Sequence, residues 1–174
     1  MRRLPAAVVA AFLAAATPAA AQNWPSFRGP DASGVAAAAK PPAAWDVKSA
    51  RNVAWKVSIP GLAHSSPIVW GNRIYVTTAV PGQAGTPTVV TGASDKAGID
   101  SARDMVAHTW RLIALDRASG AIVWNKVVHE GTPRLKRHVK SSHASSTPAT
   151  NGKQIVALLG SVNSKRRMRK SRRS

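Results

Sequence analysis

Residues 64–76 read HSSPIVWGNRIYV, and this stretch decides the fold. Two runs of β-forming residues flank Gly71-Asn72, and a two-residue connection of this composition is typical of a tight hairpin with a primed turn. The stretch recurs as HASSTPATNGKQIV at residues 143–156, where Asn151-Gly152 takes the place of the turn. A hairpin repeated along a chain indicates a repetitive architecture built from strands.

A third hairpin lies between these two copies. Residues 111–115 and 121–127 flank a turn in which Asp116 can accept backbone N–H bonds and Gly120 can adopt the left-handed conformation. Upstream, residues 52–59 alternate between apolar and polar side chains, as a half-buried strand does. Since no stretch after the N-terminal segment shows helical periodicity, the sequence predicts an all-β fold of antiparallel strands.

Two tryptophans extend the repeat. Trp55 in AWKV and Trp124 in VWNKV hold matching positions, and an insertion rich in Gly, Thr and Ala covers about residues 79–109. Without the insertion, the repeating unit has roughly 40 residues and four strands, the size of a β-propeller blade. We therefore expect residues 52–161 to form a partial propeller of about one and a half blades. Both tryptophans are expected to be packing anchors between blades rather than platforms for a ligand.

Closed propellers use about four to eight blades, so this unit would be incomplete. Each blade buries both faces of its sheet against its neighbours. Here apolar faces and strand edges would stay open, and open edges favour aggregation. We expect no stable monomeric propeller.

The N-terminus has the pattern of a signal peptide. Arg2 and Arg3 precede an apolar stretch from Ala6 to Ala16, and small residues follow up to Ala21, where cleavage is expected. The apolar stretch is shorter than the about 20 residues that cross a bilayer. Residues 1–21 are therefore expected to direct export, by the Sec or the twin-arginine route, to the periplasm or the medium, with no stable membrane anchor after cleavage. Residues 22–51, rich in Pro, Gly and Ala, are expected to be an extended lead-in.

Charge is concentrated at the two ends of the chain. The net charge is +18, and seven of the 25 Lys and Arg residues fall in the last ten positions. We expect residues 162–174 to be a disordered basic tail, and we interpret it as the product of a reading-frame shift near Ser161. Such a tail attracts nucleic acid electrostatically. It has no aromatic residue for base stacking, and an exported protein seldom meets nucleic acid, so that partner is not expected.

The motifs SP-x-x-x-GNR-x-YV at residues 66–76 and L-x-ALD-x-x-SG-x-x-x-W at residues 112–124 resemble the pyrroloquinoline-quinone (PQQ)-like β-propeller repeat. The lead-in WPSFRGP at residues 24–30 and HEGTP at residues 129–133 are similar to a secreted bacterial branch described as PQQ-binding-like β-propeller repeat proteins. The resemblance covers Asn23 to Ser161.

The resemblance implies two kinds of function. Quinoprotein dehydrogenases of the family bind PQQ and calcium in the central funnel through acidic residues and, in many cases, a vicinal cysteine pair. This chain has no cysteine, which also excludes disulfides and a lipid-anchored N-terminus, and no position matches the metal-binding Glu or catalytic Asp. Other members bind proteins and no quinone. The expected function is a non-enzymatic binding or scaffold module with protein partners; the alternative is a fragment of a PQQ-dependent dehydrogenase.

The candidate site residues are His64 and His143. They precede the two copies of the repeated hairpin, which would place them before the innermost strands that line a propeller channel. Either ligand contact or structural hydrogen bonding would suit them. Asp116 is expected to act in its turn. A basic group could attract an anion but is expected to lie in a solvated inter-blade loop: Arg134, Lys136, Arg137, His138, Lys140 and His143. The sequence suggests no catalytic residue and no metal site, and PQQ enters only through the resemblance.

Overall fold

The fold was obtained as a computed structural model, and it describes residues 23–37, 39–82, 101–102, 104, 106–159 and 167–169. The expected signal peptide, most of the insertion and most of the basic tail lie outside the described residues. In the described part, strands dominate and the helical content is one short 3₁₀ turn, Pro30–Ala32 (η1). The prediction of an all-β fold is confirmed.

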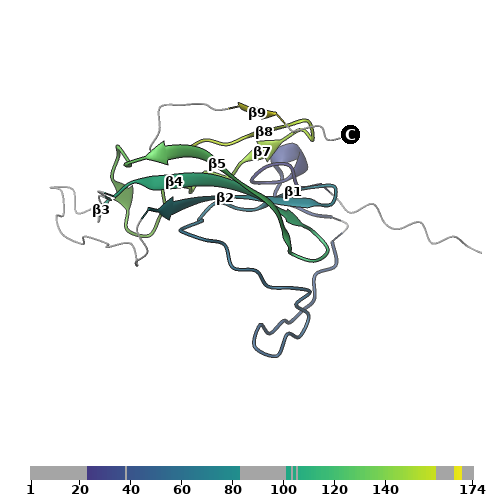
Figure 1. The fold of residues 1–174 in the computed structure, drawn as a ribbon. Helices are drawn as coiled ribbons and strands as arrows, with labels where there is room; N and C mark the ends of the chain where they lie inside the picture. Colours follow the sequence, from purple (N-terminus) through teal and green to yellow (C-terminus); the bar gives the residue numbers. More distant parts are fainter. Residues whose placement is uncertain are drawn as a thin grey trace, which may run out of the picture.

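The main sheet is an antiparallel meander of four strands (Figure 1). Its strands are β1 (Ile68–Trp70), β2 (Arg73–Pro81), β4 (His108–Asp116) and β5 (Ile122–Gly131), in the spatial order β1-β2-β4-β5. A second sheet contains β7 (Ala149–Thr150), β8 (Gln154–Val156) and β9 (Arg167–Arg169), and β3 (Ser101–Ala102) pairs with β6 (Arg137–His138). All three expected hairpins are present.

Two boundaries differ from the sequence-based expectations. Strands β2 and β4 continue past the predicted ends until Pro81 pairs with His108, so the insertion occupies residues 82–107 instead of 79–109. The segment from residue 162 onward was expected to be disordered. The structure differs over three residues, because Arg167–Arg169 pairs with β8 as its third strand. Backbone pairing does not require apolar side chains, so a basic composition did not reveal this strand.

The turns form as their residues predict. The Asp116 carboxylate accepts backbone N–H bonds from Ala118 (3.1 Å) and Ser119 (3.0 Å), and Gly120 has φ +73°. In the last hairpin the central pair is Gly152-Lys153, one position later than expected, because Asn151 opens the turn. Its Oδ1 accepts the N–H of Lys153 at 3.1 Å and of Gln154 at 2.9 Å.

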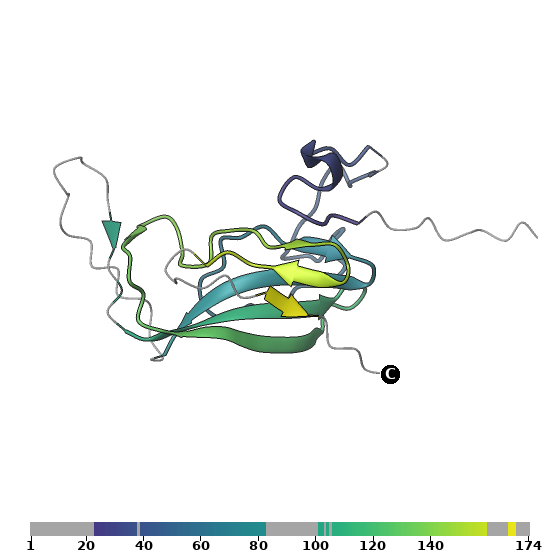
Figure 2. The same ribbon diagram turned by 90° about the horizontal axis from the view of Figure 1, so that it is seen from above.

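The main sheet is covered on both faces (Figures 1 and 2). One face carries buried side chains that pack against Ala144, Ile155 and Leu159 of the segment with β7 and β8: Ile68, Tyr75, Ala79, Trp110, Leu112, Ala114 and Val128. The other face carries the extended segment 53–60, which is attached where Thr78 Oγ1 donates to the Pro60 carbonyl at 2.6 Å. On that face Ile113 is fully buried.

The extended segment 53–59 keeps the alternation of a strand without a strand partner. Its residues alternate between half-buried and exposed, with Val53, Trp55, Val57 and Ile59 half-buried. Within the described ranges no neighbouring strand pairs with it. The Trp55 indole Nε1 donates to the Arg117 carbonyl at 3.0 Å, so its ring fixes the segment to the β4–β5 turn.

Gly120→Ala is expected to destabilise the protein more than Gly71→Ala. Both glycines have positive φ, so alanine costs about 1–2 kcal/mol at either position. A Cβ at Gly120 would also lie 2.5 Å from the Trp55 ring, whereas a Cβ at Gly71 would meet nothing within 4 Å. Displacing the indole should add about 1–3 kcal/mol. Urea unfolding of both variants measures the difference; equal losses would show that Trp55 does not pack on this turn.

Candidate functional site

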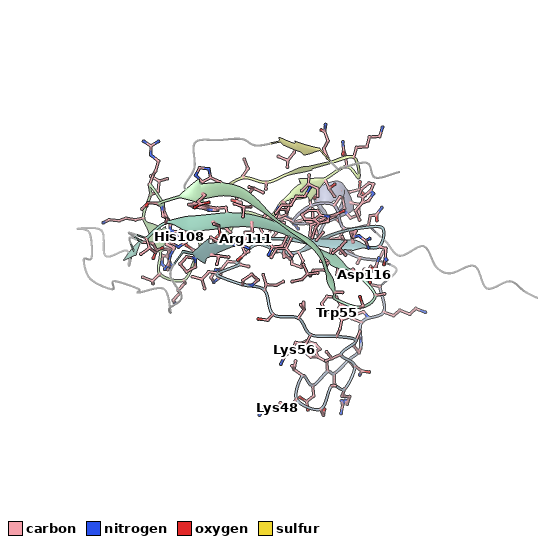
Figure 3. The ribbon with its side chains drawn as sticks, in the orientation of Figure 1. Lys48, Trp55, Lys56, His108, Arg111 and Asp116 are labelled. Atoms are coloured by element: carbon pink, nitrogen blue, oxygen red, sulfur yellow. The ribbon has the colours of Figure 1, made fainter. Side chains whose placement is uncertain are left out.

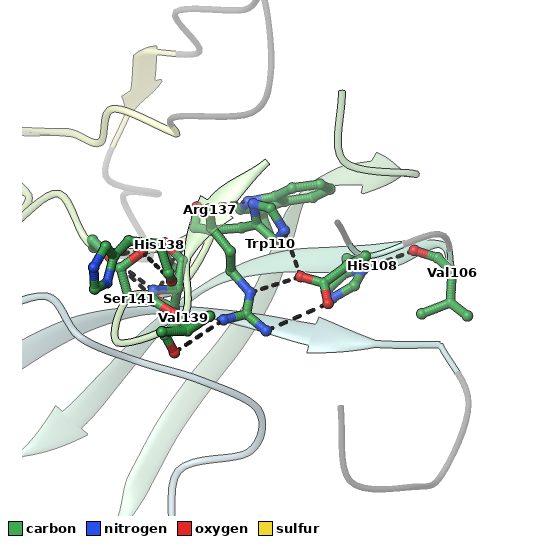
Figure 4. Close-up of polar contacts among 12 residues, drawn as sticks. Val106, His108, Trp110, Arg137, His138, Val139 and Ser141 are labelled. Carbon is green, nitrogen blue, oxygen red and sulfur yellow. Dashed lines mark hydrogen bonds and ion pairs between the residues drawn. The ribbon is translucent and has the colours of Figure 1, made fainter. Parts of the chain in front are cut away.

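Three segments meet at the end of the main sheet opposite the Asp116 turn. Arg137 Nε donates to Asp104 Oδ2 at 2.7 Å, and His143 Nε2 lies 2.8 Å from the same oxygen. Arg137 also donates through Nη2 to Asp104 Oδ1 at 3.4 Å and through Nη1 to the Ser141 carbonyl at 3.0 Å (Figure 4). All three side chains are at most 5% exposed. We call Asp104, Arg137 and His143 the buried triad.

Aromatic rings of the main sheet surround the triad. The Trp110 indole Nε1 donates to the His143 carbonyl at 3.0 Å, and the His108 ring meets the His143 ring edge-on at a centroid distance of 5.4 Å. The His129 ring lies 5.1 Å from that of Trp110. A β-bulge places His129 there, because Trp110 pairs with His129 while the next residue pairs with Val127.

The electrostatics of the triad favour a neutral His143. Burial acts to raise the pKa of the Asp104 carboxyl, but the hydrogen bonds and charge of Arg137, together with His143, lower it below its usual value. Burial is the largest effect on His143 and lowers its pKa; Asp104 acts in the opposite direction, the charge of Arg137 adds to the lowering, and the net pKa lies below the usual value. Arg137 already neutralises Asp104, so the imidazole does not need a positive charge to stay there. Its Nε2–H therefore donates to the carboxylate.

The second imidazole has a defined tautomer. His108 Nδ1 lies 2.8 Å from the Val106 carbonyl, which can only accept, so Nδ1 carries a proton (Figure 4). His108 is 4% exposed. The site thus holds two buried imidazoles, one carboxylate and one guanidinium, with the two opposite charges in direct contact.

The described residues do not fit the calcium and quinone of the dehydrogenases. Asp104 is the one buried carboxylate among them, and both its oxygens are occupied by Arg137 and His143. Asp46 and Asp116 are bound in their own turns. In the described ranges no three His, Asp or Glu side chains converge as metal ligands. We therefore assign no chemical step in this protein to calcium or PQQ.

The two candidate histidines are placed differently. His64 is exposed, whereas His143 is buried in the triad. They do not hold equivalent positions in the two hairpins, because Ile68 pairs with Tyr75 as Ala149 pairs with Val156. This register equates Pro67 with Pro148, and so His64 with Ser145. The two extra residues in the second copy shift His143 toward the main sheet.

The basic group divides in the same way. Arg134, Lys136, His138 and Lys140 are exposed, as expected for a solvated loop, but Arg137 is buried. Sequence reasoning missed Asp104, His108 and Trp110. The sequence offers one signal for these residues, a single Asp shortly before a strand on which His and Trp alternate. This signal does not indicate which residues they contact.

The tryptophans and Asp116 have packing and turn contacts. Figure 3 shows Trp55 near the Asp116 turn and His108 at the other end of β4. The Trp124 ring lies 5.9 Å from the Tyr75 ring, and Lys126 Nζ lies 5.4 Å from the Trp124 ring. Asp116 also accepts from Arg73 Nη1 at 3.1 Å, which joins two strands of the sheet.

Comparisons with known proteins give no assignment: no family model, no curated protein and no solved structure matches this chain. In the part of the chain that the structure describes, no helix has the length and hydropathy needed to cross a membrane.

Proposed function

We propose that this chain is the N-terminal part of an exported β-propeller repeat protein of the PQQ-like class that acts as a non-enzymatic binding scaffold. The observation that carries the proposal is the covering of the main sheet. A four-stranded meander lies between an extended segment, which pairs with no strand among the described residues, and the start of a second, similar hairpin sheet on the other face. Successive sheets stacked face to face are the packing of a propeller.

Exposed apolar side chains support the presence of further repeats beyond the two described sheets. On β5, the outer strand of the main sheet, Ile122 and Val123 are each 45% exposed and Val127 is 47% exposed. Val156 and Leu158 are about half-exposed on the outer side of the second sheet. Large β-branched residues on an edge strand are normally covered in a native protein. In a longer propeller, neighbouring blades would cover them, and the remaining rim would be the surface for a protein partner.

The binding scaffold and the dehydrogenase make opposite predictions for PQQ. Tryptophan fluorescence of residues 22–174 is expected to show no saturable change when PQQ is added with calcium, because the buried carboxylate is already bound to Arg137 and His143. Calcium-dependent saturation, together with dye reduction in the presence of an alcohol, would support the dehydrogenase. A chelator and a quinone without the carboxylates are the controls.

Export is tested by the mature N-terminus. Expressed with its own leader in a Gram-negative host, the protein is expected in the periplasmic fraction with Gln22 as its first residue. Replacing Ala19 and Ala21 with bulky residues should leave the precursor uncleaved. An uncleaved wild-type chain in the cytoplasm would contradict export.

A further inference from the structure

We propose that the buried triad is a pH-sensitive latch, in which protonation of His143 releases residues 137–147 from the main sheet. The inference concerns packing between described segments and does not depend on the proposed scaffold function.

The geometry gives one carboxylate to two donors. Asp104 Oδ2 accepts from Arg137 at 2.7 Å and from His143 at 2.8 Å, and the guanidinium cannot lose its proton. With His143 neutral, the triad has no net charge. Protonation adds one positive charge that no other buried carboxylate in the described residues can balance. An unbalanced buried charge costs several kcal/mol in general.

The surroundings of His143 increase this cost. On β4, the His108 ring contacts it at 5.4 Å, and on β6 the Arg137 guanidinium shares its carboxylate. On β5, His129 lies on the Trp110 ring, which also contacts the His108 and His143 rings. Among the described residues that contact His143, Asp104 carries the one negative charge.

The latch holds two layers together. The His143 carbonyl accepts the Trp110 indole N–H at 3.0 Å, and Ala144, the next residue, is 1% exposed within the core. Arg137 Nη1 fixes the same loop through the Ser141 carbonyl. Beyond Ala144 the chain continues directly to β7. Release of this segment would therefore uncover Trp110 and the apolar face of the main sheet.

The direction of the pH dependence follows from linkage. Burial holds the pKa of His143 below its usual value, so the unfolded chain binds this proton more readily than the folded one. The stabilising contribution is complete above the ordinary histidine pKa of about 6.5 and is lost as pH falls through the lower folded value. Loss of the Asp104 contribution requires a further fall, below the ordinary carboxyl pKa of about 3.9.

Hydrogen exchange with mass-spectrometric readout tests the latch in the full chain. The amide exchange rates measured at pH 7.5 and pH 5.0 are divided by the intrinsic exchange rates of an unfolded chain at the same pH. We expect protection of residues 137–147 to fall by about tenfold or more at pH 5.0, since each pH unit between the ordinary histidine pKa and the lower folded pKa costs up to a factor of about ten. Protection of β2 and β4 should change much less. Equal protection of residues 137–147 at the two pH values would overturn the proposal.

Two variants separate His143 from the other histidines. His143→Gln keeps an N–H donor for Asp104 but cannot be protonated, so its protection should not depend on pH. His138→Gln, in the same loop but exposed, should behave as the wild type. A His143→Gln variant that still opens at pH 5.0 would overturn the proposal. If this variant does not fold, the titration of the His143 ring protons in the wild type by NMR is measured instead. A titration midpoint below pH 6.5 that coincides with opening of residues 137–147 supports the latch, and any other midpoint contradicts it.

Discussion

Asp104→Ala is expected to cost about 3–5 kcal/mol of unfolding free energy, because it leaves the Arg137 guanidinium buried without its counter-charge. His143 also loses the acceptor for its Nε2–H. Urea unfolding at pH 7.5, followed by tryptophan fluorescence, measures the loss.

Asp46→Ala is the matched control for this prediction. Asp46 is an exposed carboxylate that accepts from the Lys48 N–H and the Ser49 hydroxyl within one turn. Its removal takes away the same side chain from a solvated position, so its effect should be far smaller than that of Asp104→Ala. Equal effects of the two variants would mean that the triad does not hold the segments together.

Trp110→Ala should destabilise the protein by about 3–5 kcal/mol, the usual cost of removing a large buried aromatic side chain. Trp110 is fully buried, and it contacts both the His129 and His143 rings. Trp110→Phe keeps an aromatic ring but loses the Nε1–H donor to the His143 carbonyl. Part of the loss, about 1–3 kcal/mol, should therefore remain in that variant. Since replacing a tryptophan itself changes the fluorescence, unfolding by denaturant is followed by far-UV circular dichroism.

Trp45→Ala controls for the loss of a tryptophan as such. Trp45 is 68% exposed, and substitutions at such surface positions stay within about 0.5 kcal/mol. A loss of several kcal/mol at Trp45, or none at Trp110, would contradict the position assigned to the core.

The hairpins were predictable because their signals are local. Asp116 and Gly120 close a turn with backbone contacts no more than five residues apart, and the alternation of residues 52–59 survives as alternating exposure. Segment 53–59 nevertheless has no strand partner among the described residues. Alternation reports which side chains face a neighbouring layer, and it does not require that a second strand is present.

The buried triad was not predictable because its contacts are distant in sequence. Arg137 and His143 lie 33 and 39 residues from Asp104, which belongs to an insertion without periodicity. Aligning the repeat on its histidines also hid the two extra residues before Pro148. Only the strand register shows that His143 has no counterpart at His64.

We propose that this chain is an incomplete propeller whose outer surfaces pack against further blades. Sedimentation velocity of residues 22–174 over a wide concentration range tests it most directly. The exposed β-branched residues of β5 and the outer residues of the second sheet predict self-association, with a sedimentation coefficient that rises with concentration. A monomer at every concentration, with one cooperative thermal transition, would contradict the claim and show that the described fold is complete in itself.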